Sequence, residues 1–143
     1  MSLRTLLAFI GFATMLLQAP VAFSQSGETP PSIEGAKTVT PADVKNILGK
    51  ALVLDVRKKA SYLEGRIPGA KSITAHFDAE KKTFATAAFG SDKSAIIVIY
   101  GHGSDGWSAV HATRSAVAGG YSNVLWLRTG WVSWAEQKMP VEQ

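Results

Sequence analysis

The sequence has 143 residues and no cysteine, and this absence excludes several kinds of chemistry. A chain without a thiol has no disulfide, no thiolate metal site and no cysteine nucleophile. It also has no run of basic residues, because the charges that make up its net +4 are spread along the chain. We therefore expect no nucleic-acid partner.

The composition is that of one folded domain. Hydrophobic residues make up 46% of the chain and charged residues 18%, which is typical of a packed globular core and excludes a disordered chain. The length also suggests a single domain.

The first 24 residues have the pattern of an export signal. Arg4 precedes an apolar stretch at residues 6–17, which is short for a membrane span. Ala22 and Ser24 are small residues at the two positions that a signal peptidase reads, which predicts cleavage before Gln25. We expect a signal peptide at 1–24 and a periplasmic or secreted product without a stable membrane anchor. The alternative is an uncleaved anchor.

The rest of the chain predicts an α/β domain. Residues 25–35 contain a Pro-Pro pair and are expected to form a flexible linker before a domain at 36–143. Strands are expected at residues 36–39, 51–54, 71–73, 96–100 and 123–127, and helices at 41–48, around 60–63, at 107–118 and at 131–137. Strands that alternate with helices predict a mostly parallel sheet with helices on both faces. Residues 74–92 have no clear pattern, and their three phenylalanines are expected to anchor short helices or turns.

The apolar run at residues 96–100 ends in a glycine-rich loop that organises the domain. Three glycines within residues 101–106 cannot continue the strand, and an alanine-rich helical pattern follows them. A strand, a glycine-rich loop and a helix N-terminus form the usual place for a functional site in α/β proteins, and their N–H groups favour an anion. The candidate ligand-binding loop consists of Gly101, His102, Gly103, Ser104, Asp105, Gly106 and Trp107.

Two groups of residues on either side of this loop resemble the rhodanese-like domain family. Residues 54–57 and 62–70 resemble its first signature, while residues 120–124, Gly130, Trp134 and residues 139–141 resemble its closing segment. The resemblance covers residues 36–143. It implies a rhodanese-like α/β fold with a five-stranded parallel sheet and a functional site at the loop after the fourth strand.

The chain departs from this family at the two side chains that carry its chemistry. Active members place a persulfide-carrying cysteine where this chain has Gly101. They usually place a basic residue near the end of the loop, where Trp107 either covers the pocket or fills the vacated volume. Sulfur transfer needs a thiolate, so we expect no sulfurtransferase activity. We also expect no cofactor.

Without a nucleophile, the loop is expected to bind a small anion, a sulfur species or a protein partner. The Gly-Trp-Ser sequence at 106–108 resembles a subset of exported rhodanese-like proteins linked to quinoprotein oxidation in bacteria. That resemblance implies a protein partner in periplasmic oxidative metabolism.

The loop leaves one catalytic alternative open. His102 could activate Ser104 in a hydrolase or transferase, as in acyl or phosphoryl transfer. A metal held by His102, Asp105 and His111, together with His76, is a second form of this alternative, although the spacing matches no helical pair of ligands and we predict no metal site. We expect Ser104 or Asp105 to cap the following helix, and His102 to be exposed.

Asp55 and Arg57 follow the second predicted strand, next to the loop. In a functional interpretation, both side chains orient a ligand. In a structural interpretation, Asp55 accepts hydrogen bonds from loop amides and Arg57 pairs with a carboxylate, which is the commoner use of such residues.

Overall fold

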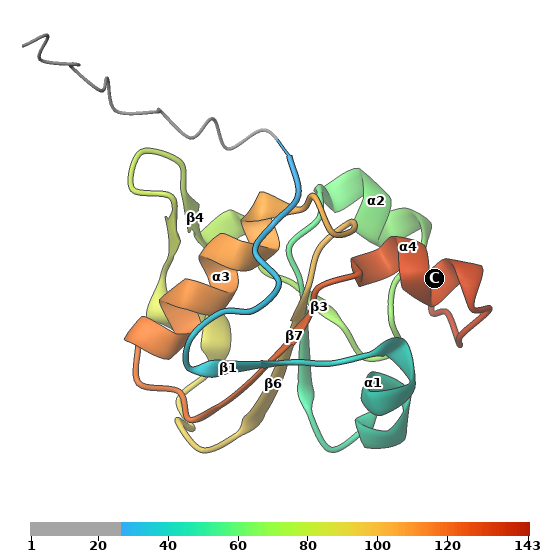
Figure 1. Ribbon diagram of the computed structural model, residues 1–143, viewed down its shortest axis with the longest axis horizontal. Helices are drawn as coiled ribbons and strands as arrows, with labels where there is room; N and C mark the ends of the chain where they lie inside the picture. The colour runs from blue at the N-terminus through green and yellow to red at the C-terminus, as the bar shows by residue number, and fades with distance from the viewer. Residues whose placement is uncertain (1–26) are drawn as a thin grey trace, which may run out of the picture.

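The computed structural model describes residues 27–143, which are built around a five-stranded parallel sheet (Figure 1). The strands in spatial order are β1 (Ala36–Thr38), β7 (Asn123–Leu127), β6 (Ile96–Tyr100), β2 (Leu52–Asp55) and β3 (Lys71–Ser72). The helices are α1 (Pro41–Ile47), α2 (Lys59–Glu64), α3 (Trp107–Ala118) and α4 (Gly130–Glu136). This arrangement confirms the α/β class and the five-stranded sheet.

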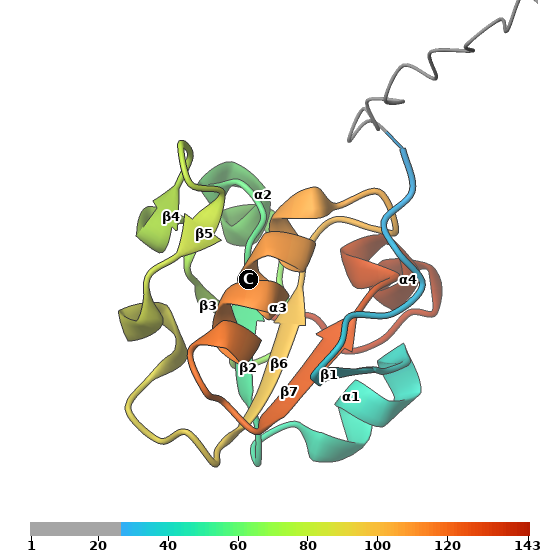
Figure 2. The same ribbon diagram turned by 60° about the vertical axis from the view of Figure 1, so that its left-hand side comes forward.

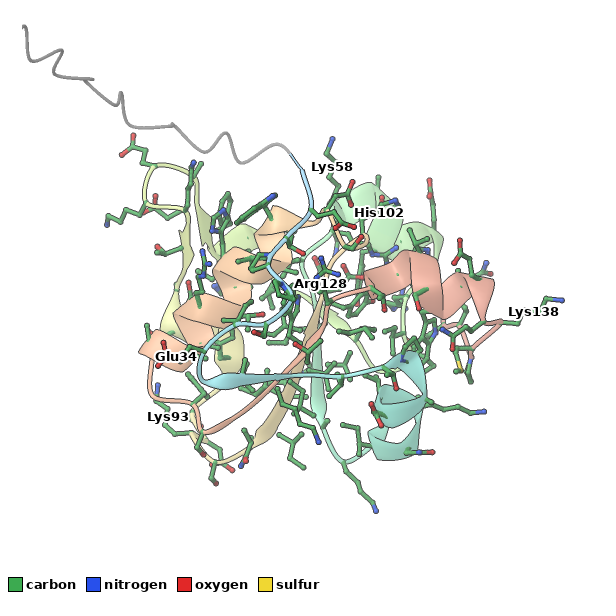
Figure 3. The ribbon with its side chains drawn as sticks, in the orientation of Figure 1. Glu34, Lys58, Lys93, His102, Arg128 and Lys138 are labelled. Carbon is green, nitrogen blue, oxygen red and sulfur yellow. The ribbon has the colours of Figure 1, made fainter. Side chains whose placement is uncertain are left out.

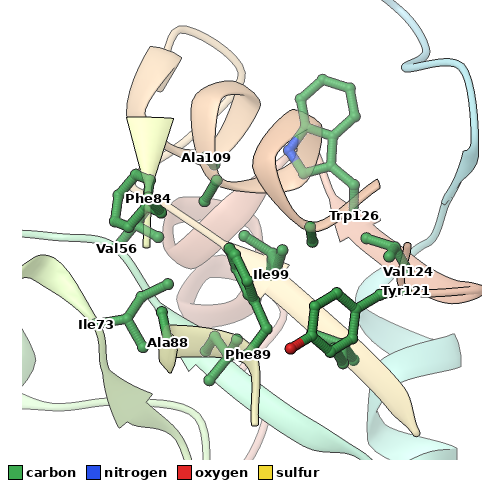
Figure 4. Packing of buried hydrophobic residues seen from close by; sticks show 14 of the residues in the cluster. Val56, Ile73, Phe84, Ala88, Phe89, Ile99, Ala109, Tyr121, Val124 and Trp126 are labelled. Carbon is green, nitrogen blue, oxygen red and sulfur yellow. The ribbon is translucent and has the colours of Figure 1, made fainter. Parts of the chain in front are cut away.

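The central strand β6 contributes to two hydrophobic cores, one on each face of the sheet. Alternate side chains of a strand point to opposite faces. Ile97 and Ile99 accordingly pack with residues of α3, as Figure 4 shows in part, and Val98 and Tyr100 pack with α1 and α4. The sheet therefore lies between α3 on one side and α1 with α4 on the other (Figure 2).

The register of the sheet brings three loops to one edge. Asp55 at the end of β2 is level with Tyr100 at the end of β6, and Tyr100 is level with Leu127 at the end of β7. The segments that follow these strands therefore meet at the carboxyl edge of the sheet, where α/β folds place their functional sites.

The first helix begins as the sequence predicts. The Thr40 hydroxyl accepts a hydrogen bond from the Asp43 N–H, and the Asp43 carboxylate accepts one from the Thr40 N–H at 2.9 Å. This reciprocal capping box satisfies two amides that the helix itself leaves unpaired. Pro41 occupies the first turn, and Gly49 has a left-handed φ of +82° just beyond the end.

A small β-hairpin in residues 74–92 was not among the predicted elements. After the 3₁₀ turn η1 (Thr74–His76), β4 (Phe77–Asp78) pairs antiparallel with β5 (Thr83–Phe84), and a second turn, η2 (Thr86–Phe89), follows. Two-residue strands are too short to show an alternating pattern. Phe84 and Phe89 are buried anchors as expected, but Phe77 is 37% exposed.

The segment before β1 packs against the domain, which differs from the expected flexible linker. Thr29 and Ile33 are buried, and the Arg128 guanidinium donates to the carbonyl oxygens of Thr29 and Pro30 at 2.8 and 2.9 Å. Packing therefore begins before residue 36. The expected signal peptide at 1–24 lies outside residues 27–143, and within those residues no helix has the length and apolar content needed to cross a bilayer.

Candidate functional site

The loop after β6 is held from one side by the first turn of α4. The N–H groups of Trp131 and Val132 donate to the carbonyl oxygens of Gly101 and His102, each at 2.9 Å. Gly130 makes this approach possible, because its φ is +59° and a Cβ there would lie 2.6 Å from the Gly101 oxygen. The conformation of the loop thus depends on backbone contacts that only glycine at position 130 allows.

The N-terminal segment holds the loop from another side. The Ser104 carbonyl accepts from the Thr29 N–H at 2.9 Å and from the Thr29 hydroxyl at 2.6 Å. The indole Nε1 of Trp107 donates to the Gly27 carbonyl at 3.1 Å. Trp107 therefore contacts the N-terminal segment, and it is not among the residues that line the cavity at Gly101.

Among residues 27–143 no side chain caps α3, so the expectation for Ser104 and Asp105 was wrong. The N-cap residue is Gly106, whose N–H donates to the Gly103 carbonyl at 2.9 Å. The Trp107 N–H donates to the Asp105 carbonyl at 3.1 Å. The N–H groups at the start of α3 thus donate to carbonyl groups of the loop itself, and not to a side chain as predicted.

The loop side chains form no catalytic pair in this geometry. His102 is exposed, as expected, and within residues 27–143 it forms no hydrogen bond with Ser104, whereas an activated serine requires about 2.6–3.2 Å to its base. In the same part of the chain, no three His, Asp or Glu side chains converge as metal ligands. His111 instead packs between the rings of Phe77 and Trp107, at 6.4 and 6.3 Å between centroids. Its burial, and then the charges of two nearby basic residues, lower the pKa of its imidazole.

Gly101 lies at a cavity of about 350 Å³. A Cβ at this position would lie 3.3 Å from the Ala109 Cβ and 3.5 Å from a Val56 methyl group. This contact is close and requires only a small adjustment. The cavity is lined by Val56, Arg57, Lys58, Ser61, Gly101, His102, Gly106, Ser108 and Ala109, none of which is acidic. Figure 3 shows Lys58 and His102 at the same end of the molecule.

The other side of the loop faces a second cavity, of about 480 Å³, with a different chemistry. Ser104, Asp105 and Glu136 line it together with His102. The loop therefore separates a basic cavity from one that contains carboxylates. Asp105, which would oppose an anion, lies on the side away from Gly101.

Asp55 and Arg57 form a buried ion pair beneath the basic cavity. The Asp55 carboxylate accepts from the Arg57 Nε and Nη2 atoms, at 2.6 Å in the shortest contact, and from the Arg57 N–H at 2.8 Å. Nη2 also donates to the Gly65 carbonyl at 2.6 Å. The Asp55 carboxylate therefore pairs with the Arg57 guanidinium, and the loop amide from which it accepts is that of Arg57 itself.

The Tyr100 hydroxyl completes this cluster. It donates to Asp55 at 2.6 Å and accepts from the Ile67 N–H at 3.2 Å. Burial, and then the charge of Asp55, raise the pKa of this hydroxyl above its ordinary value. The Arg57 guanidinium lies 4.4 Å from the centre of the Trp131 ring. Every charge in the cluster is paired within the protein.

Comparison with known proteins agrees with this geometry. The model of the rhodanese-like domain family matches residues 40–137. The chain belongs to this family. Comparison with curated proteins finds no match.

Solved structures of rhodanese-like domains and related proteins share the fold. A protein from Bacillus halodurans, BH2092, is 23% identical with a TM-score of 0.60, over 74% of this chain and 76% of that one. The rhodanese-like domain of the Alr3790 protein from Anabaena sp. is 27% identical with a TM-score of 0.55, over 73% and 77%. A thiosulfate sulfurtransferase from Pseudomonas aeruginosa is 22% identical with a TM-score of 0.58, over 76% of this chain and 20% of that larger protein.

This rhodanese-like domain contains no cysteine, which is consistent with an inactive domain. Its fold is retained around a loop that is positioned mainly by hydrogen bonds to its backbone carbonyl groups.

Three residues that shape the site were missed in the sequence. Tyr100 was placed in a buried strand, Trp131 was assigned no role in this site, and Lys58 had no motif of its own. Only the position of Lys58 directly after the Asp-Val-Arg signature could have indicated that it borders the cavity.

Proposed function

We propose that this protein is an exported rhodanese-like domain without sulfurtransferase turnover, which binds a small anion, a sulfur species or a protein partner at the loop of residues 101–107. The observation that carries the proposal is Gly101, which stands at the cavity of about 350 Å³ where active members place their cysteine. The export signal pattern and the resemblance around residues 106–108 support a partner in periplasmic oxidative metabolism.

The chemistry of sulfur transfer supports the first part. The reaction stores sulfane sulfur on a thiolate, which must be both nucleophilic and able to release the sulfur. Neither the hydroxyl of Ser104 nor the imidazole of His102 can hold a persulfide. The cavity itself remains, and its basic lining favours a negatively charged occupant.

A turnover assay tests the absence of activity. The purified protein, incubated with thiosulfate and cyanide, is expected to form no more thiocyanate than a heat-inactivated sample of the same protein. Thiocyanate formation above that control would overturn the proposal.

Restoring the nucleophile tests whether the cavity still accepts sulfur. Gly101→Cys is expected to take up one sulfur atom from thiosulfate, measured as a mass increase of the intact protein, because the added Cβ needs only a small shift of Ala109 and Val56. Ser104→Cys is the matched control, since it places a thiol on the same loop but beside the other cavity. A folded Gly101→Cys protein that takes up no more sulfur than Ser104→Cys would show that the binding site is lost.

Fractionation tests the export. Full-length protein expressed in a Gram-negative host is expected in the periplasmic fraction with a mass that begins at Gln25, while a protein that lacks residues 1–24 is expected to stay in the cytoplasm. An unprocessed, membrane-bound product would support the alternative anchor.

A further inference from the structure

The basic cavity continues into an apolar one. A cavity of about 300 Å³ shares Val56, Lys58 and Ser108 with the cavity at Gly101, and extends to Phe77 and Phe84 of the β4–β5 hairpin. Figure 2 shows this hairpin beside α3, with α2 behind it. Together the two cavities form one groove, the Lys58 groove, which runs from Gly101 to Phe77 between α2, α3 and the hairpin.

The charges along the Lys58 groove all have one sign. The charged or titratable side chains that line it are Arg57, Lys58, Lys59 and His102, and none of the lining residues is acidic. Arg57 is neutralised by Asp55, whereas Lys58 is exposed and has no ion-pair partner in residues 27–143. The groove is therefore complementary to a negative charge placed near Lys58.

The end of the groove farthest from Gly101 is apolar, and an inorganic anion would gain nothing from contact with it. Phe77 is 37% exposed, and its ring lies 5.0 Å from that of the buried Phe84. Phe84 lies beside Val56 and Ala109 (Figure 4), and all three are largely buried, so they form the floor of the groove while Phe77 supplies its exposed apolar side chain. A ligand with an apolar body would remove this surface from water and gain affinity from it.

We propose that the Lys58 groove binds an organic anion with an aromatic or otherwise apolar body. The negative group lies beside Lys58 and His102, and the body lies on Val56, Phe77 and Phe84. This inference rests on the proposed function, because it names the class of ligand for the same loop. It differs from that function in requiring the hairpin, which lies outside loop 101–107.

Binding of three probes to the purified protein separates the contributions of charge and apolar surface. By isothermal titration calorimetry, 2-naphthalenesulfonate is expected to bind at least tenfold more tightly than inorganic sulfate, and at least tenfold more tightly than the neutral 2-naphthalenesulfonamide. A tenfold difference corresponds to about 1.4 kcal/mol. Sulfate binding as tight as that of the naphthalenesulfonate would overturn this inference and leave the proposed anion site standing. Equal binding of the sulfonamide would overturn the role of charge. Binding of neither sulfate nor the naphthalenesulfonate would overturn this inference together with the anion-binding part of the proposed function.

Matched variants locate the site. Lys58→Glu is expected to weaken binding of 2-naphthalenesulfonate at least fivefold, and Lys50→Glu, which makes the same charge change at an exposed position away from the groove, is expected to leave it unchanged. Phe77→Ala is expected to weaken the same binding at least fivefold, whereas Leu63→Ala, at another exposed apolar residue, is not. Circular dichroism shows whether Phe77→Ala is folded, and Phe77→Leu serves as a second variant if it is not. Equal losses in a variant and its control would place the ligand elsewhere and overturn the inference.

Discussion

The carboxyl ends of β2 and β6 lie side by side in the sheet, yet they are stabilised in different ways. At the end of β2, buried side chains carry the contacts: the Asp55 carboxylate accepts hydrogen bonds from Arg57 and Tyr100, and both partners are themselves buried. At the end of β6, backbone groups carry them, since the Gly101 and His102 carbonyls accept hydrogen bonds from the first turn of α4.

This difference explains how the domain can keep the family fold without the family nucleophile. A single substitution of Asp55 or Arg57, at the end of β2, should destabilise the fold, because removal of one charge would leave the other buried and unpaired. The loop after β6 depends on its backbone, so the side chain at position 101 is free to change without loss of a stabilising contact. Asp55 and Arg57 therefore contribute to the stability of the fold, whereas a side chain at position 101 would change the lining of the cavity.

Breaking the ion pair at β2 should produce the largest effect on stability. Asp55→Ala leaves the Arg57 guanidinium buried, at 4% side-chain exposure, without its carboxylate partner. We expect a loss of about 3–5 kcal/mol in the free energy of unfolding, measured with urea. Asp105→Ala removes a carboxylate from the loop after β6, where it is exposed, and should change stability by less than about 0.5 kcal/mol.

A double variant sharpens this first prediction. Asp55→Ala combined with Arg57→Leu removes both charges and should recover part of the lost stability, because no unpaired charge remains buried. A double variant less stable than Asp55→Ala alone would show that Arg57 acts mainly through its contacts with Gly65 and Trp131.

The backbone contacts at β6 should break with a substitution at Gly130. In Gly130→Ala the new Cβ meets the carbonyl oxygens of Gly101 and His102 at 2.6 and 2.8 Å, on a backbone with positive φ. We expect a loss of about 2–3 kcal/mol, with changed amide chemical shifts throughout residues 101–107. Gly49→Ala is the matched control, because its φ is +82° but no atom lies within 4 Å of the new Cβ. Equal losses at both positions would mean that backbone strain alone, and not the contact with the loop, is responsible.

Most of the fold could be predicted from the sequence because its signals are local. The apolar runs at β2, β6 and β7 mark the strands, and the Thr40–Asp43 capping box marks a helix start within four residues. The β4–β5 hairpin could not be predicted because its two-residue strands are too short to show an alternating pattern. The packing of residues 27–33 could not be predicted because it depends on contacts distant in sequence, such as that of Thr29 with Ser104. The position of the candidate loop could be predicted from its glycines, but its partners in α4 and in the N-terminal segment could not.

The Tyr100 hydroxyl couples the two regions, and removing it should have an intermediate effect. Tyr100→Phe takes one donor from Asp55 and leaves the buried Ile67 N–H without an acceptor, for an expected loss of about 2 kcal/mol. The variant should also respond differently to alkali. An unfolded tyrosine loses its proton near pH 10, while in the folded protein the raised pKa keeps Tyr100 protonated. The stability of the natural protein should therefore fall as the pH rises above about 10, and this component should be absent in Tyr100→Phe.

The contact between the N-terminal segment and the loop should give the smallest effect. Thr29→Val removes the hydroxyl that donates to Ser104 at 2.6 Å, but it keeps the side-chain shape and the second donor, the N–H at 2.9 Å. We expect a loss of about 1 kcal/mol, together with faster hydrogen exchange of the residue 29 amide, because the buried segment then opens more easily. Thr38→Val removes a longer, exposed hydrogen bond of 3.4 Å to Pro31 and should leave both measurements nearly unchanged. If Thr29→Val behaves like Thr38→Val, the Thr29 hydroxyl does not help to hold the loop after β6, and the N-terminal segment contributes only through the Thr29 N–H and the Trp107–Gly27 hydrogen bond.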